Sequence, residues 1–235
     1  MLDVFSAQPE PPHLLVAVTA LAALAVVLLR RPWRLARNAI TIAHEGGHAL
    51  LAVLTGRRLR GIRLHSDTSG LTLSAGRPTG FGMVLTLLAG YVTPSLLGLA
   101  GAALLAADRI RLMLWLSVAL LLVMLVMMRN AYGILAVLAT GALVFAVSWY
   151  ASASVQAAFA YSGVWFLLLG GVKPIAELQR LRRRGRLPGS DADQLAGVTR
   201  VPAITWVGLF GIVNLAALAV GAFLLGEALI PNGTG

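Results

Sequence analysis

Long apolar stretches recur along this chain, and they constrain its fold more than any other feature. Seven of them approach the roughly 20 mostly apolar residues that a membrane-spanning helix needs. They lie at about 14–29, 38–55, 81–107, 112–128, 132–151, 154–172 and 203–225. Hydrophobic residues make up 58% of the chain and charged residues only 12%, against about 25% charged in an ordinary soluble domain. The sequence therefore predicts an all-α integral membrane protein with about six or seven transmembrane helices.

Basic residues are divided unevenly between the expected loops. The chain has 19 Lys and Arg against 9 Asp and Glu, a formal net charge of +10. If the stretches alternate in direction, the loops divide the basic residues into a larger and a smaller group on opposite sides of the membrane. The smaller group includes Arg30, Arg31, Arg34 and Arg37. The larger group is expected in the cytoplasm, at the lipid headgroups. The pattern predicts a multi-pass protein of the cell membrane with the lipid bilayer as a partner, and no nucleic acid.

The second apolar stretch contains a motif with metal chemistry. It reads His44-Glu45-Gly46-Gly47-His48, which is the pattern H-E-x-x-H. On a helix, positions four apart share one face, so both imidazoles can bind one zinc ion while Glu45 takes a proton from a zinc-bound water. Ionisable groups inside a membrane span are costly and mark functional sites. A polar cluster that pins helix packing is one alternative, and a proton or metal relay in a small transporter is another.

The zinc site needs a third protein ligand, since two histidines and a water leave tetrahedral zinc one short. The chain has no Cys, so the acidic residues are the candidates. Asp191 and Asp193 follow the sixth stretch, on the same expected side of the membrane as the loop after the motif. Asp191 is the preferred ligand and Asp193 the alternative. Capping of a helix that begins after Ser190 is the other explanation for both carboxylates.

A β-hairpin is expected directly after the motif helix. Residues 61–65 alternate apolar and polar side chains, and the turn-forming segment 66–70 joins them to 71–73. An edge strand here could bind an unfolded substrate segment by strand addition. That would matter because a membrane helix hides its peptide bonds in internal hydrogen bonds. A plain surface hairpin is the alternative.

Taken in order, these pieces resemble the site-2 protease family of membrane zinc metallopeptidases, in particular its small, mostly uncharacterised bacterial branch. The resemblance covers about residues 40–99 and ends in a segment that Gly90 and Pro94 interrupt, although helix packing alone also explains these two residues. It is looser over about 129–195. The resemblance implies intramembrane proteolysis in a bacterial plasma membrane.

The sequence departs from this family at the third ligand. Well-studied members use an Asp in an Asn/Pro-rich motif on a later core helix, and here Asn130 and Gly133 are present without that Asp. Asp191 is then the best replacement, and Asn130 a polar partner of substrate or water. The departure leaves open a catalytically inactive membrane protein whose structural or degenerate zinc site serves as a binding or regulatory partner.

The expected organisation is a single polytopic membrane domain, 1–235. Its metal-binding core lies at about 38–107, and a loop at about 176–202 carries the candidate third ligand. The expected function is a zinc metalloprotease that hydrolyses peptide bonds of membrane or membrane-proximal proteins through zinc-activated water. A membrane protein or peptide is the expected substrate partner.

Overall fold

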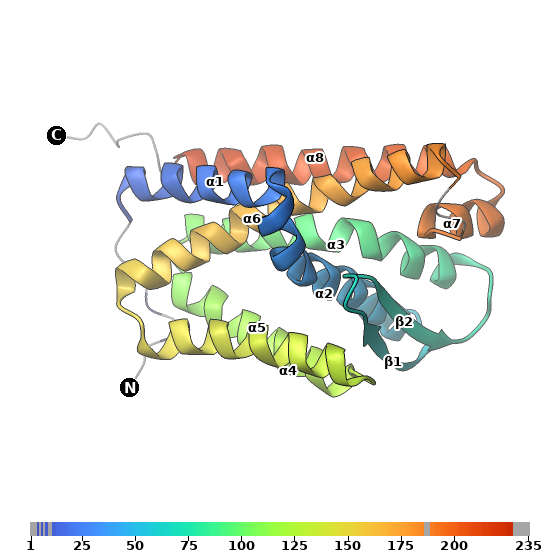
Figure 1. Ribbon diagram of the computed structural model, residues 1–235, viewed down its shortest axis with the longest axis horizontal. Coiled ribbons are helices and arrows are strands. Elements are labelled where there is room, and N and C mark those ends of the chain that lie inside the picture. The colour runs from blue at the N-terminus through green and yellow to red at the C-terminus, as the bar shows by residue number, and fades with distance from the viewer. Residues whose placement is uncertain (1–3, 5, 7, 9–10, 186–188, 228–235) are drawn as a thin grey trace.

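The computed structural model describes residues 4, 6, 8, 11–185 and 189–227. Its helices are α1 (His13–Leu28), α2 (Arg30–Leu54), α3 (Phe81–Ala106), α4 (Ile110–Met127), α5 (Ala131–Tyr150), α6 (Ala153–Arg183), α7 (Asp191–Thr199) and α8 (Ala203–Glu227). Strands β1 (Arg58–Leu64) and β2 (Gly70–Ala75) form an antiparallel hairpin. Helices α1, α3, α4, α5, α6 and α8 run along roughly one direction, α2 runs obliquely to them, and α7 and the hairpin lie at one end (Figure 1). The prediction of an all-α membrane protein with a short hairpin after the motif is confirmed.

Five helices in the described part of the chain are long and apolar enough to cross a membrane, namely α3, α4, α5, α6 and α8. A sixth candidate is the pair α1 and α2, which is bent by 100°. The bend lies at Leu29, whose extended backbone interrupts the helix, and Pro32 follows in the first turn of α2, where its missing N–H is tolerated. The predicted span at 38–55 is therefore not a candidate by itself, because α2 passes the test of length and composition only together with α1.

The bend also corrects the predicted placement of the arginines near residue 30. Arg30, Arg34 and Arg37 line one open cavity together with Lys173 and Arg180 of α6. They thus share one space with two basic residues of the C-terminal half of α6. The prediction had placed Lys173 and Arg180 in the larger basic group, on the other side of the membrane from these arginines. That separation was wrong, because it counted 38–55 as a complete span.

The hairpin is attached to the bundle along β1. Ile62 forms a parallel bridge with Met128, and the Arg129 N–H donates to the Ile62 carbonyl. A bulge lies between Leu59 and Gly61, and Gly61 has a φ of +139° that only glycine adopts without strain. The outer edge of β1 is therefore covered, whereas β2 pairs only with β1 among the described residues.

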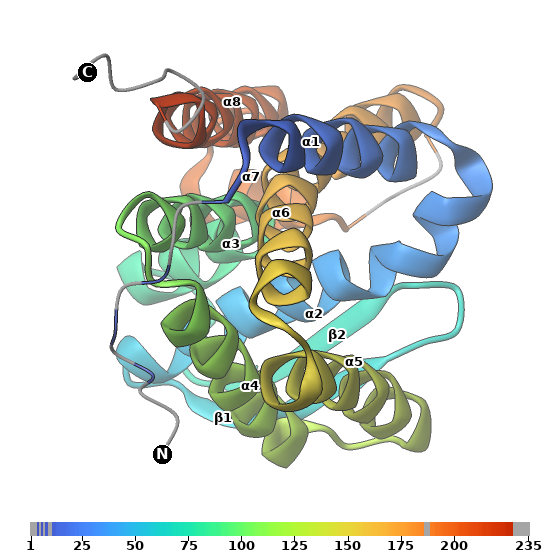
Figure 2. The ribbon, with the colours of Figure 1, turned by 90° about the vertical axis from the view of Figure 1, so that its left-hand side faces the viewer.

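Apolar packing positions α7 beside the centre of the bundle. Ala192 and Leu195 of α7 are fully buried in a cluster with Leu178 of α6, Leu87 of α3 and Phe210 of α8. On the opposite side, α2 crosses from α1 toward the hairpin, next to which α4 and α5 lie (Figure 2). Helix α3 thus has α2 on one flank and α7 on another, and the candidate site residues gather where these three helices meet.

Candidate metal centre

Helix α2 presents both motif histidines on one face, toward α3. The Nε2 atoms of His44 and His48 are 3.0 Å apart, and the two rings meet edge to face. A close approach of α2 and α3 makes this possible, because a Cβ on Gly47 would lie 2.2 Å from the Thr93 hydroxyl and 2.8 Å from the Ala89 carbonyl oxygen. Gly47 therefore serves helix packing.

The first residue of α7 completes the group. Asp191 Oδ2 lies 3.3 Å from Nε2 of His44 and 3.3 Å from Nε2 of His48, and its side chain is only 14% exposed. Atoms bound about 2.0–2.2 Å from a tetrahedral zinc ion are about 3.3–3.6 Å apart. The triangle of two nitrogens and one oxygen has nearly these edges, so the donor set fits a zinc ion in both chemistry and spacing.

Asp193 has a different role, although it lies only two residues further along α7. Its Oδ1 accepts hydrogen bonds from Arg182 at 2.8 and 3.1 Å, and its Oδ2 accepts from the hydroxyl and the backbone N–H of Ser190. The Asp193 N–H donates in turn to the Ser190 hydroxyl, which completes a capping box. Helix capping thus explains Asp193, while Asp191 is the carboxylate that meets the imidazoles.

Both carboxylates of α7 are held in the ionised form. Burial alone would raise the pKa of Asp191, but the neighbouring His48 and His44 outweigh it and hold that pKa well below its usual range. For Asp193, burial also opposes ionisation, and the hydrogen bonds from Ser190 and Arg182 lower its pKa on balance. An ionised carboxylate is the form that binds a metal, so Asp191 is ready for this role.

Helix α3 leaves space for a metal beside the imidazoles. A Cβ on Gly90 would lie 2.3 Å from Nε2 of His48 and 2.6 Å from Nε2 of His44. Any other residue would therefore crowd the two nitrogens that can bind a metal. The sequence drew attention to Gly90 as an interruption of an apolar stretch, and its contact with the imidazoles went unpredicted.

Two further α3 residues orient the histidines, and neither was predicted. Nδ1 of His48 lies 2.6 Å from the Thr86 carbonyl oxygen. When the Nδ1–H group donates a hydrogen bond to this carbonyl, Nε2 carries no proton and its lone pair is free for a metal. The Tyr91 ring packs edge to face on His44, with 4.8 Å between ring centroids. The four-residue spacing of Thr86 and Gly90 places both on the α2-facing side of α3, but nothing in the sequence ties that side to the motif.

The Glu45 carboxylate is held by the hairpin. Thr72 of β2 donates its hydroxyl to Glu45 Oε2 at 2.6 Å, and a Cβ on Gly70 would lie 2.4 Å from Oε1. The Thr41 hydroxyl, one turn before Glu45, donates to the Thr68 carbonyl at 2.9 Å. Glu45 is itself 4% exposed. Glu45 thus follows His44 directly in the chain and is buried. Its carboxylate is oriented by strand β2, which contributes no atom to the ligand group.

Asn130 has a structural partner. It lies at the start of α5, where its amide nitrogen donates to the Leu64 carbonyl at 2.7 Å and its amide oxygen accepts from the Leu64 N–H at 3.2 Å. The side chain therefore extends the pairing along the outer edge of β1. Its predicted contact with substrate or water stays a prediction.

One of the comparisons with known proteins assigns the chain to a family. The model of the Peptidase M50B-like family matches residues 17–221. The chain belongs to this family. The resemblance to site-2 proteases is thereby confirmed, and an M50B-like chain with this many apolar helices is a multi-pass membrane protein of a metallopeptidase class. The comparisons with curated proteins and with solved structures give no match.

Proposed function

We propose that this M50B-like protein is a zinc metalloprotease that cleaves peptide bonds of membrane or membrane-proximal proteins. The observation that carries the proposal is the triangle of ligand atoms from His44, His48 and Asp191. Three protein ligands are typical of catalytic zinc, and four of structural zinc. Among the described residues, no fourth His, Cys, Asp or Glu joins the group. The ligand count thus favours catalysis over a purely structural zinc.

Zinc held by these residues would lower the pKa of a coordinated water and polarise a peptide carbonyl. Glu45 would act as the general base. The Thr72 hydroxyl donates to Oε2 and so restricts the rotation of the carboxylate. The other oxygen, Oε1, lies against Gly70, which has no side chain to cover it. Glu45 would take a proton from the attacking water through that oxygen and pass it to the leaving amine.

Strand β2 is the proposed binding edge for substrate. The Ile62 carbonyl accepts from Arg129 on the far side of β1, so the pair of Ile62 and Thr72 is one of those that exchange no hydrogen bonds. The Thr72 N–H and C=O then face the outer edge of β2. A peptide added to this edge would be extended, with its peptide bonds free of helical hydrogen bonds, alongside the strand that orients Glu45.

The Glu45→Gln variant tests this function. It keeps the shape of the side chain and removes the base, so hydrolysis is expected to fall by about 10²- to 10⁴-fold, while the protein retains its zinc. Membranes containing wild type or variant are compared for newly formed protein N-termini by mass spectrometry, which requires no known substrate. Asp108→Asn is the matched control, because it neutralises a carboxylate in the turn between α3 and α4. The same new N-termini in Glu45→Gln and wild type would contradict the role of Glu45.

A further inference from the structure

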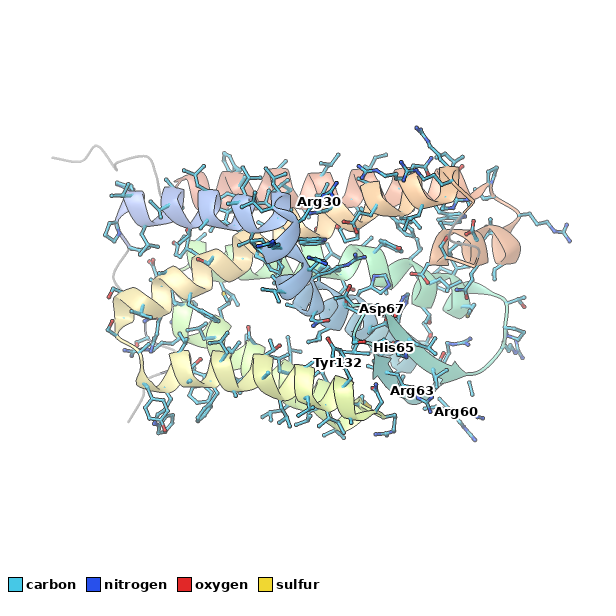
Figure 3. The ribbon with its side chains drawn as sticks, viewed as in Figure 1. Arg30, Arg60, Arg63, His65, Asp67 and Tyr132 are labelled. Carbon is cyan, nitrogen blue, oxygen red and sulfur yellow. The ribbon has the colours of Figure 1, made fainter. Side chains whose placement is uncertain are left out.

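An open cavity of about 800 Å³ lies at the bend between α1 and α2. The end of α1, the beginning of α2 and the C-terminal half of α6 form its walls, with one residue from α8. None of His44, Glu45, His48 or Asp191 lines it. We call this cavity the bend groove. Arg30, which lines it, lies where the two helices meet (Figure 3).

The bend groove is strongly basic. Its five basic side chains are Arg30, Arg34, Arg37, Lys173 and Arg180, and its single carboxylate is Glu177. Glu177 is already paired with Arg37 at 3.1 Å. Lys173 donates to the Val27 carbonyl and lies over the Trp33 ring. The groove therefore carries an excess of positive charge that its own acid cannot neutralise.

Three of these arginines have guanidinium groups available for a ligand. The side chains of Arg30, Arg34 and Arg180 have no ion pair or hydrogen bond with any residue that the structure describes. All three are exposed. Guanidinium groups bind phosphate through paired N–H donors, so the groove offers three phosphate-binding groups without a protein counter-ion.

The remaining wall of the bend groove is apolar. Leu24 and Leu28 of α1 are 38% and 67% exposed, and Leu218 of α8 faces the same space. These leucines belong to helices that are candidate membrane spans or part of one. The cavity thus has an apolar wall from α1 and α8 and a basic wall from the beginning of α2 and the C-terminal half of α6, which is the pattern that an amphiphile with an anionic head requires.

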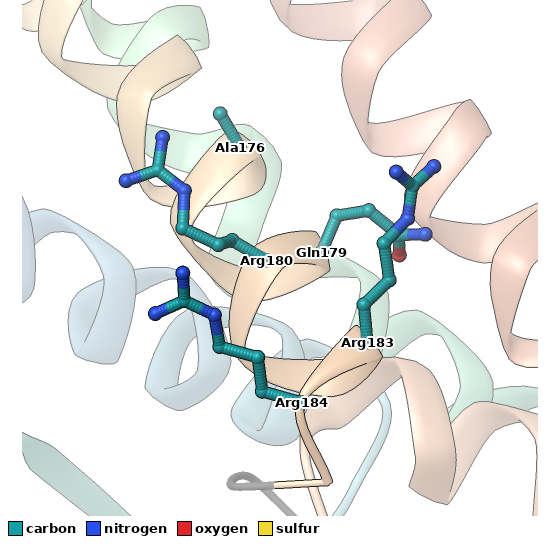
Figure 4. Close-up of a pocket in the computed structure, with 5 residues that line it drawn as sticks. All are labelled: Ala176, Gln179, Arg180, Arg183 and Arg184. Carbon is teal, nitrogen blue, oxygen red and sulfur yellow. The ribbon is translucent and has the colours of Figure 1, made fainter.

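The positive charge continues along α6 beyond the groove. A second hollow is lined by Arg180, Arg183 and Arg184 together with Ala176 and Gln179. Arg180 and Arg184 extend from the same side of the helix, and Arg183 extends from the other side, beside Gln179 (Figure 4). Arg180 is shared by both hollows. The basic end of α6 therefore forms a charged surface at one level of the bundle, as lipid headgroups would meet it.

We propose that the bend groove binds one anionic phospholipid. Its phosphate would be held by Arg30, Arg34 and Arg180, and its acyl chains would lie along Leu24 and Leu28. Charge complementarity favours this ligand over a zwitterionic lipid, and the apolar wall favours it over free phosphate. The groove begins on the same helix that carries His44 and His48, so the lipid would contact the N-terminal turns of the helix that bears the motif.

The test is a lipid titration of the full chain in detergent, followed by native mass spectrometry. The probes are phosphatidylglycerol, phosphatidylcholine, inorganic phosphate and an acidic peptide. The variant combines Arg30→Gln, Arg34→Gln and Arg180→Gln. Each basic residue near an anionic membrane surface strengthens binding by roughly fivefold, so the affinity for phosphatidylglycerol is expected to fall by roughly 100-fold. The matched control makes the same charge change on β1, with Arg58→Gln, Arg60→Gln and Arg63→Gln, and is expected to bind as wild type does.

Four results would overturn the proposal. These are an equal loss of phosphatidylglycerol in the control variant, equal binding of phosphatidylcholine by wild type, equally tight binding of inorganic phosphate, and displacement of the lipid by the acidic peptide. Arg34→Gln alone serves if the triple variant does not fold, with an expected loss of roughly fivefold. Zinc content, measured in parallel, reports on the metal centre independently of lipid binding.

Discussion

Helices α2 and α7 meet at the same candidate metal centre but reach it by different means. In α2, which has 25 residues, the helix itself sets the spacing of His44 and His48. In α7, which has 9 residues, Asp191 reaches the imidazoles because Leu195 is packed against the bundle and Ser190 caps the first turn. One half of the site is thus encoded locally, and the other half depends on tertiary packing.

The two helices also differ in what supports them. Thr86, Gly90 and Tyr91 of α3 contact the α2 histidines directly. Asp191 has only the two imidazoles as ion-pair partners among the described residues. His44 and His48 of α2 should therefore keep their arrangement without a metal. The contact of α7 with α2 through Asp191 should depend on a bound metal.

Removal of the metal should have the largest effect, because it separates the two halves. Treatment with EDTA should abolish hydrolysis and speed amide exchange in 191–199 by about tenfold or more, since a ligand that binds only the folded state adds to its stability. Helices α4 and α5 contribute no ligand and serve as the internal control. Hydrogen exchange with and without added zinc measures the effect. An unchanged α7 would show that packing through Leu195 holds it without the metal.

Substitution in α3 should disturb the α2 half next most strongly. The Cβ of a Gly90→Ala variant would overlap both Nε2 atoms. Overpacking typically costs about 1–3 kcal/mol, so zinc affinity is expected to fall by about 10- to 100-fold in a competitive chelator titration. Gly163→Ala is the matched control, because a Cβ on Gly163 of α6 meets nothing within 4 Å. Equal zinc affinities of the two variants would place the metal elsewhere.

A smaller effect is expected at the hairpin, which orients Glu45 and contributes no ligand. Thr72→Val removes the hydroxyl that donates to Glu45 and keeps the shape of the side chain. Loss of such a supporting hydrogen bond typically costs about 10- to 100-fold in activity, so kcat should fall toward the lower end of that range with zinc content unchanged. Thr140→Val is the control, since its hydroxyl bonds within α5. An undiminished kcat would remove the hairpin from the proposed mechanism.

Sequence reasoning succeeded where the information is local. The motif at His44 and His48 lies on a helix, and residues 61–73 fall in a hairpin, because both patterns follow from backbone periodicity. The bend at Leu29 was missed because two apolar stretches were each taken as a span. Thr86 and Tyr91 could not be assigned, since their contacts depend on how α3 packs against α2.

The choice between Asp191 and Asp193 shows the limit most clearly. Residues two apart on a helix differ by about 200° in direction, so one carboxylate could meet α2 while the other faced away. The sequence could not decide which, because the rotation of α7 is set by the burial of Ala192 and Leu195 against three other helices. In the observed rotation of α7, the Asp193 carboxylate accepts hydrogen bonds from Arg182 and Ser190.

Zinc content of the Asp191→Asn and Asp193→Asn variants is therefore the most direct test of the metal centre. Both variants remove one charge from the same turn of α7 and keep the side-chain shape. Wild type and Asp193→Asn are expected to hold about one zinc per chain, measured by elemental analysis of purified protein, and Asp191→Asn is expected to lose most of it. Zinc retained by Asp191→Asn, or lost only from Asp193→Asn, would contradict the proposed ligand set.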